Sequence, residues 1–200
     1  MMFDYDRFLV DQVIRPVANL YRVTPLAVGE TPAGPPIAYV RQKKLAIKED
    51  IRFYADESES EELFRLKARS VLDMGGSRYD VSVGDERIGV LRHKFLESLY
   101  RSTWHIGGPD ETEAGIARES STAVGILRRA IDFVPYVGEF IPIPYNFEIV
   151  IDGEVAGTMR RKFVRVRDQY VLDLSGDRER KIDRRVAVAL AVGLDALQNR

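Results

Sequence analysis

Cysteine is absent from this 200-residue sequence, and only two histidines occur, His93 and His105. The lack of cysteine excludes disulfides, thiolate metal sites, thiol nucleophiles and palmitoylation. The scarcity of histidine argues against most zinc sites and many acid–base mechanisms. The sequence also lacks the Gly-x-Ser-x-Gly, Walker, Rossmann and His-Glu-x-x-His motifs. We therefore expect no metal, no cofactor and no enzymatic activity.

Long hydrophobic runs are missing as well. The longest apolar stretch, Val186–Leu194, has nine residues including Gly193, whereas a membrane-spanning helix needs about 20. Residues Met1–Asp11 are charged and contain no apolar run followed by small residues, so we expect no signal peptide. These features predict a cytoplasmic protein, with peripheral association at the membrane as an alternative.

The charges of the chain are nearly balanced. With 30 basic and 31 acidic residues, the formal net charge is −1. Such a chain is not a general binder of polyanions, and aromatic residues are not interleaved with its basic runs. We therefore expect no nucleic-acid partner.

Short alternating apolar segments, typical of half-buried antiparallel strands, run from about Phe8 to Leu174. Tight turns separate them, and Asp152-Gly153 between two apolar runs predicts a type I′ hairpin. Strands recur about every 8–12 residues, which predicts a sandwich or a barrel.

The C-terminal segment has apolar residues at helical spacing and predicts a helix over about residues 178–197, with Asp177 as its N-cap. Apolar and small residues occupy every side, which is typical of a helix buried all round. One such helix after many amphipathic strands predicts strands that curl around it. The residues expected to be almost fully buried are Val186, Ala189, Leu190, Gly193 and Leu194.

Three segments are expected to be irregular. Gly29–Pro36 contains three prolines and two glycines, so it cannot be a regular strand. Glu49–Glu62 has seven acids in fourteen residues. We interpret it as a solvated hairpin connection after a strand at Ile51–Tyr54, with a calcium site as the weaker alternative. Ile131–Tyr145 is expected to pack over one mouth of a barrel, with an exposed interaction loop or membrane-dipping loop as the alternative.

An internal repeat aligns Tyr79–Phe95 with Phe147–Phe163 without a gap. Five of the 17 aligned columns are identical, among them Gly89/Gly157 and Arg92/Arg160. Glycine inside a strand marks a bend or a close approach. We therefore expect the two glycines at equivalent positions, where they let a sheet curve into a closed barrel.

The segments that carry a family resemblance are Ala38–Lys43, Tyr79–Gly89, Gly157–Lys162, Asp168–Asp173 and Ile182–Asp195. Through them the chain resembles the LURP-one-related family, within the wider tubby C-terminal and phospholipid scramblase superfamily. The resemblance implies one domain over residues 1–200. Its fold would be a closed antiparallel tubby-like barrel of about twelve strands around a buried hydrophobic C-terminal helix.

The same resemblance bears on function. Tubby domains bind phosphoinositide headgroups through surface Lys and Arg, although no residue of that pocket can be carried over to this chain. Scramblases are associated with cysteine palmitoylation and a calcium-binding segment. This chain has no cysteine, and no clear calcium-binding segment follows its expected barrel, so we do not expect lipid scrambling.

Basic residues are the main functional signal. Arginine outnumbers lysine 23 to 7, and its guanidinium fork suits phosphate. We predict a non-enzymatic binding module that associates with anionic phospholipid headgroups or an acidic protein. The alternative is a structural or protein-interaction barrel with a salt-bridged surface and no lipid or small-molecule ligand. The candidate headgroup residues are Arg160, Lys162, Arg41, Lys43, Arg92 and Lys94.

Strand parity refines one of these groups. If Val155 and Met159 face inward, Arg161 points into the barrel, where it needs an acidic partner or a place at the rim. Arg160 and Lys162 then face outward together, as a headgroup site requires.

The two histidines are expected to have structural roles. We interpret His93, between two basic residues, as a surface or packing residue, and His105 as a strand-end residue. Catalysis by His105 with Ser102 or Ser120 is the weaker alternative.

Overall fold

A computed structural model of the chain describes residues 2–14, 18–43, 50–69, 76–94, 102–120, 146–164 and 167–198. They form a series of strands followed by one helix, in the expected order. The elements are β1 (Arg7–Ile14), β2 (Ala18–Pro25), β3 (Ala38–Lys43), β4 (Asp50–Tyr54), β5 (Glu62–Ala68), β6 (Gly76–Val83), β7 (Glu86–Lys94), β8 (Thr103–Gly107), β9 (Glu113–Glu119), β10 (Phe147–Ile151), β11 (Glu154–Val164), β12 (Arg167–Asp173) and α2 (Arg184–Gln198).

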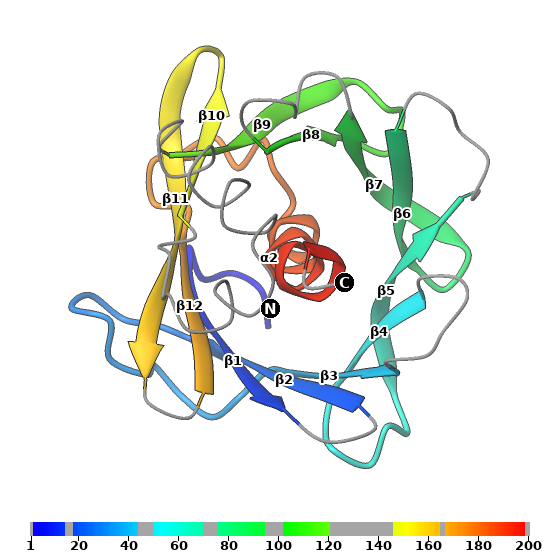
Figure 1. Cartoon of the computed structure of the whole chain (residues 1–200), viewed down its shortest axis with the longest axis vertical. Helices are drawn as coiled ribbons and strands as arrows, with labels where there is room; N and C mark the ends of the chain where they lie inside the picture. Colours follow the sequence, from blue (N-terminus) through cyan, green and yellow to red (C-terminus); the bar gives the residue numbers. More distant parts are fainter. Residues whose placement is uncertain are drawn as a thin grey trace, which may run out of the picture.

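The strands close into an antiparallel barrel around α2 (Figure 1). Each strand pairs with its neighbours in the chain, and β1 closes the barrel by pairing with β12. Successive side chains of a strand point to opposite faces, so one set fills the interior and the other covers the outer wall. In β10, for example, Phe147, Ile149 and Ile151 are buried. The predicted closed barrel of about twelve strands is confirmed.

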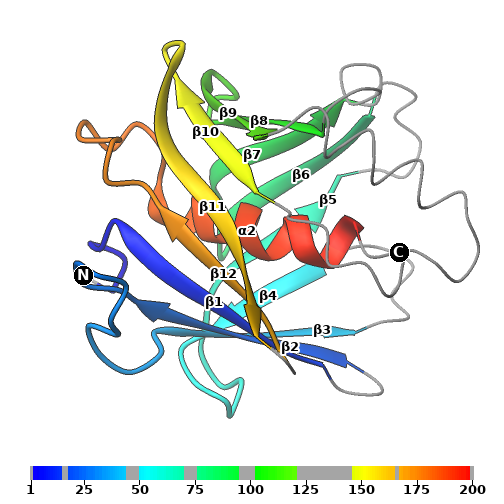
Figure 2. The same cartoon turned by 60° about the vertical axis from the view of Figure 1, so that its left-hand side comes forward.

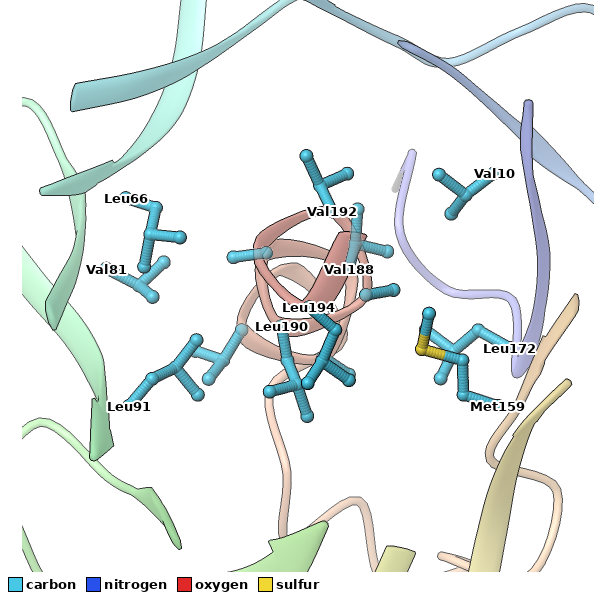
Figure 3. Close-up of a cluster of buried hydrophobic side chains, with 14 of the residues drawn as sticks. Val10, Leu66, Val81, Leu91, Met159, Leu172, Val188, Leu190, Val192 and Leu194 are labelled. Carbon is cyan, nitrogen blue, oxygen red and sulfur yellow. The ribbon is translucent and has the colours of Figure 1, made fainter. Parts of the chain in front are cut away.

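Helix α2 lies along the inside of the barrel (Figure 2). The residues from Val186 to Val192 are at most 2% exposed, and Leu194 is 1% exposed. Burial of each large apolar side chain contributes about 1.5–3 kcal/mol. The predicted burial of the helix is confirmed. Figure 3 shows its side chains surrounded by residues of the barrel wall, among them Val10, Leu66, Val81, Leu91, Met159 and Leu172.

The start of the helix corrects one prediction. The helix begins at Arg184, later than expected, and its N-cap is Asp183 rather than Asp177. The Asp183 carboxylate accepts a hydrogen bond from the backbone amide of Arg185 at 2.8 Å. Asp177 lies in the preceding turn, where its carboxylate accepts hydrogen bonds from two other backbone amides. Both aspartates precede the apolar pattern, so periodicity alone did not distinguish them.

Each end of α2 is held by a buried aspartate. Near the N-terminus, the carboxylate of Asp177 lies 2.6 Å from Nη1 of Arg184, and both side chains are 2% exposed. Near the C-terminus, Asp195 accepts hydrogen bonds from the hydroxyls of Tyr21 and Tyr170. These polar contacts fix the helix to the barrel wall at both ends.

The two repeat units form the hairpins β6–β7 and β10–β11 with the same register. Gly89 and Gly157 each pair with the residue eight positions earlier, and a β-bulge follows at the same place in both hairpins. A Cβ at Gly89 would lie 2.6 Å from Cγ2 of Val186 in α2. A Cβ at Gly157 would lie 2.6 Å from the carbonyl oxygen of Asp173. The predicted equivalence of the two glycines is therefore confirmed, and both permit a close approach.

The β10–β11 hairpin confirms one expectation and corrects another. Asp152 and Gly153 both have positive φ, 52° and 86°, as a type I′ turn requires. Val155, however, is 54% exposed, whereas Met159 is 1% exposed. The bulge between them adds a residue and reverses the parity, so the prediction that Val155 faces inward was wrong. Arg161 shares the inward parity of Met159, and it has the acidic partner that this orientation requires. Nη2 of Arg161 lies 2.5 Å from Oδ1 of Asp168.

The expected irregular segments have different outcomes. Gly29–Pro36 contains no strand, only an isolated bridge at Pro32, as predicted. The acidic segment connects β4, which ends at Tyr54, to β5, which begins at Glu62, so the predicted hairpin connection is confirmed. The segment 131–145 lies outside the described residues.

Candidate functional site

The expected headgroup residues lie on three strands that are far apart in the barrel. The closed strand order places four steps between any two of β3, β7 and β11, so the three groups do not share one face. The side chains of two of the six residues, Lys43 and Lys94, lie outside the described ones. The groups are Arg41 and Lys43 on β3, Arg92 and Lys94 on β7, and Arg160 and Lys162 on β11.

Arg160 and Lys162 share one acidic partner, Glu30. Nη2 of Arg160 lies 2.5 Å from Oε1 of Glu30, and Nζ of Lys162 lies 2.5 Å from Oε2. The hydrogen bond from Lys162, together with that from Arg160, holds the pKa of Glu30 below its usual range. Both cations face outward as expected, with 53% and 39% of their side chains exposed. A headgroup bound here would have to displace Glu30.

Arg41 and Arg92 are also held by glutamates of strand connections. Nη1 of Arg41 lies 3.1 Å from Oε1 of Glu59, and Nη2 of Arg92 donates to the carbonyl oxygen of Glu111 at 2.8 Å. Glu30, Glu59 and Glu111 all have a left-handed backbone, with φ of 59°, 58° and 69°. Each also donates its N–H to the carbonyl three residues earlier. Similar acidic turns therefore fold back on the outer wall at three places.

These turns belong to one end of the barrel, at which the connections are acidic. Connections with this charge can pair with arginines that project from the barrel wall. The five connections between strands at this end contain nine acidic residues and no basic one, and they span residues 26–37, 55–61, 84–85, 108–112 and 152–153. The connection from β12 to α2 lies at the same end and also carries Arg178, Arg180 and Lys181.

A row of three arginines crosses the outer wall of β3, β4 and β5. In this arginine row (Arg41, Arg52 and Arg65), Arg41 lies directly opposite Arg52, and Arg52 lies directly opposite Arg65. Their side chains are 53%, 45% and 26% exposed. Directly opposite residues have Cβ atoms about 5 Å apart, a distance at which like charges repel. The row therefore concentrates positive charge on one part of the wall.

Four carboxylates lie within 4.0 Å of the arginine row and offset its three positive charges: Asp50, Glu59, Glu62 and Asp85. Nη2 of Arg52 lies 3.1 Å from Asp50, and Glu62 lies between Arg52 and Arg65 at 3.4 and 4.0 Å. The hydrogen bond with Asp50 raises the pKa of Arg52, so its guanidinium stays charged. Exposed ion pairs of this kind contribute about 0–1 kcal/mol. A headgroup bound to the row would have to displace these carboxylates, as it would have to displace Glu30 on β11.

Next to the row lies a tyrosine groove of about 250 Å³. Its lining includes Leu20 of β2 and the two tyrosines Tyr39 and Tyr54, which are directly opposite each other on β3 and β4. Glu57 and Glu59 of the β4–β5 connection form part of its lining. Figure 1 shows this connection, in cyan, outside the barrel wall. The groove thus combines aromatic surface with charged groups.

The histidines take part in local contacts. Nδ1 of His105 lies 2.6 Å from Oε2 of Glu113, and the ring of His93 packs against Trp104 with centroids 4.8 Å apart. The packing role predicted for His93 is therefore confirmed. A larger cavity of about 530 Å³ lies beside the first turn of α2, and neither it nor the tyrosine groove is lined by a histidine. Neither cavity therefore supports the histidine-based enzyme alternative.

Two further findings concern metals and membranes. Among the residues that the structure describes, no group of three or more acidic or histidine side chains could hold a metal ion. Within the same residues, no helix combines the length and the apolar character needed to cross a membrane.

Sequence reasoning did not identify Arg52 and Arg65, although a signal was present. Each arginine lies between two apolar residues of a strand, so each is expected to point outward. Parity does not show which outward residues of different strands face each other, because that depends on the register of the barrel. The same limitation applied to Tyr39 and Tyr54.

The chain was compared with known proteins. A protein-family model described as LURP-one-related matches residues 37–195, well over half of the chain. No curated protein and no solved structure matches the sequence. The matched range includes the arginine row, the two tyrosines of the groove and α2 as far as Asp195.

Proposed function

Because the chain belongs to the LURP-one-related family, we propose that it is a non-enzymatic binding module that associates with anionic phospholipid headgroups through the arginine row. The observation that supports this proposal is the direct opposition of Arg41, Arg52 and Arg65 on neighbouring strands. Of the six residues predicted from the sequence, Arg41 belongs to this row.

The chemistry of the row suits a surface of phosphates. A guanidinium presents several N–H donors in a planar fork and binds phosphate oxygens with two hydrogen bonds. Neighbouring strands are about 4.8 Å apart, so adjacent guanidiniums could bind adjacent headgroups or one shared phosphate. A bridging anion would also relieve the repulsion between the arginines. Such binding should weaken as the salt concentration rises.

The other predicted residues remain a separate part of the proposal. Arg160 and Lys162 already bind Glu30, and Arg92 binds a backbone carbonyl. We therefore expect these residues to contribute less to headgroup binding than the arginine row. These internal pairs favour the second candidate function, a barrel that binds a protein and no lipid.

Vesicle co-sedimentation tests the lipid proposal. We expect the wild-type protein to bind vesicles of phosphatidylcholine and phosphatidylserine at low ionic strength, and not vesicles of phosphatidylcholine alone. Each basic residue near an anionic surface contributes about 1 kcal/mol, so Arg52→Gln/Arg65→Gln should weaken binding about thirtyfold. The matched control Arg160→Gln/Lys162→Gln removes two charges on β11 and should bind within about threefold of the wild type. Thermal unfolding checks that both variants are folded.

Three results would contradict the proposal. Absence of salt-sensitive binding by the folded wild-type protein would reject lipid binding and leave the protein-interaction candidate. Equal losses in the two variants would show that overall charge, and not the row, drives association. A loss only in Arg160→Gln/Lys162→Gln would place the site on β11.

A further inference from the structure

We propose that the tyrosine groove is a docking site for an acidic segment of a partner protein, and that Glu57 and Glu59 of the β4–β5 connection (residues 55–61), which line the groove, mimic the carboxylates of that segment. This inference does not depend on lipid binding. It rests on the way in which two glutamates of the connection bind two arginines that flank the groove.

The groove presents a matched pair of guanidiniums. Tyr39 lies directly opposite Tyr54 on one side and Arg22 on the other. Arg41 is two residues after Tyr39, so it points to the same face of β3. Both arginines line the groove together with the two tyrosines and Leu20, and Arg41 lies directly opposite Leu20 on β2. An occupant with two carboxylates and little bulk would complement this surface.

The connection presents two carboxylates with that spacing. Oε1 of Glu57 lies 2.6 Å from Nη2 of Arg22, and Oε1 of Glu59 lies 3.1 Å from Nη1 of Arg41. The two glutamates are separated only by Ser58 in a turn in which Glu59 has a left-handed backbone. A partner segment with a Glu-x-Glu pattern could therefore present its carboxylates to the same two arginines.

The shape of the connection is set by its own contacts. The carboxylate of Asp56 accepts hydrogen bonds from the backbone N–H of Ser58 at 2.7 Å and from its hydroxyl at 2.5 Å. Glu59 has a left-handed backbone and donates its N–H to the carbonyl oxygen of Asp56 at 3.4 Å. The turn can therefore keep its shape when its glutamates leave the arginines.

The exposed ion pairs make displacement feasible. The side chains of Arg22 and Glu57 are 44% and 64% exposed, and those of Arg41 and Glu59 are 53% and 34% exposed. Exposed pairs are weak, yet a tethered competitor acts at a high effective concentration. Neutralising the two glutamates should therefore strengthen the binding of an acidic segment added in solution. A flat membrane surface fits less well, because the connection stands beside the groove as a wall.

The test uses the full chain and a synthetic peptide with the sequence of residues 55–61. Binding is followed by NMR through the backbone amides of Arg22, Tyr39, Arg41 and Tyr54. We expect the variant Glu57→Gln/Glu59→Gln to bind the peptide about fivefold more tightly than the wild type. Glu61→Gln, a matched change in the same connection, should bind like the wild type, because no described residue forms an ion pair with Glu61.

Further variants and a substituted peptide test whether binding occurs in the groove and whether it requires carboxylates. In the background of Glu57→Gln/Glu59→Gln, an added Arg22→Gln should weaken peptide binding at least threefold. A peptide with glutamine in place of the glutamates that correspond to Glu57 and Glu59 should bind at least threefold more weakly than the unsubstituted peptide. Arg52→Gln/Arg65→Gln should leave peptide binding unchanged even if it abolishes vesicle binding, so the two proposals can fail separately.

Several outcomes would overturn the inference. One is a variant Glu57→Gln/Glu59→Gln that does not bind the acidic peptide. Another is equal binding of the glutamine-substituted peptide, or shifts confined to residues outside the groove. A gain in vesicle binding without a gain in peptide binding would assign the surface that the connection covers to a membrane.

Discussion

The two ends of α2 both bury an aspartate, and the barrel stabilises the two carboxylates differently. Asp177, near the N-terminus, lies against the guanidinium of Arg184, which also binds Asp6 at 2.7 Å. Asp195, near the C-terminus, is held by the hydroxyls of Tyr21 and Tyr170. A buried carboxylate can thus be stabilised by an opposite charge or by hydrogen bonds, and the two solutions predict different responses to mutation and pH.

At the C-terminal end of α2, the pKa values of Asp195 and of the two tyrosines that bind it are shifted. Burial raises the pKa of Asp195, and the hydrogen bonds from Tyr170 and Tyr21 only partly oppose this effect. Burial and the neighbouring charge of Asp195 raise the pKa of both tyrosines. The tyrosines therefore stay protonated and remain donors over the range in which Asp195 titrates.

Removal of the Arg184 guanidinium at the N-terminal end of α2 should lower the free energy of unfolding most. Arg184→Met leaves Asp177 buried without its guanidinium, and breaking a buried pair in this way costs about 3–5 kcal/mol. Urea unfolding at neutral pH measures the loss. The double variant Asp177→Asn/Arg184→Met removes the uncompensated charge and should recover part of the stability. Equal stability of Arg184→Met and the wild type would show that the pair is unimportant.

Neutralising Asp195 should change the free energy of unfolding less, and the change should depend on pH. The folded protein binds this proton at a higher pH than the unfolded chain, so wild-type stability falls as the pH rises from the ordinary carboxyl pKa of 3.8 to the raised value. Asp195→Asn should lack this fall. Its stability relative to the wild type should increase by about 1.4 kcal/mol for each unit by which the pKa is raised. Urea unfolding between pH 4 and 7 checks the sign, and a constant difference would contradict it.

Substitution of the helix cap, Asp183, should change the free energy of unfolding least. Its pH dependence should be opposite to that of Asp195. Burial alone would raise the pKa of Asp183, but hydrogen bonds from the side chain and backbone of Arg185 outweigh it and lower the pKa. Asp183→Ala should therefore cost about 1 kcal/mol at neutral pH. The difference should disappear as the pH falls below the ordinary carboxyl range, because the wild-type cap then becomes protonated. A cost that persists in acid would show that the loss is not electrostatic.

The repeat shows how far sequence reasoning reached. Alignment of the two units predicted that Gly89 and Gly157 are equivalent, and their register confirms it. Strand parity took no account of the bulge, so it placed Val155 on the wrong face. A bulge changes side-chain parity without a clear local signal, because the extra residue depends on the curvature of the whole sheet.

The candidate site was less accessible to prediction. The excess of arginine over lysine indicated an anionic ligand, and Arg41 was among the candidate headgroup residues. The row formed with Arg52 and Arg65 requires the register of three strands, which a single sequence does not show. The acidic segment Glu49–Glu62 was expected to contain a solvated connection, and its sequence did not show that Glu57 and Glu59 also bind arginines of the barrel wall.

The sequence by itself determined the strands and the buried helix, since periodicity of side chains is a local property that follows from backbone geometry. The closed barrel of about twelve strands was implied by the family resemblance. Only the tertiary structure decided which charges meet. Glu30 and Arg160, for example, are separated by 130 positions in the chain and lie in contact. Pairing across a barrel depends on register and on the path of its connections, so the same arginines could be free or neutralised until the fold brings their partners to them.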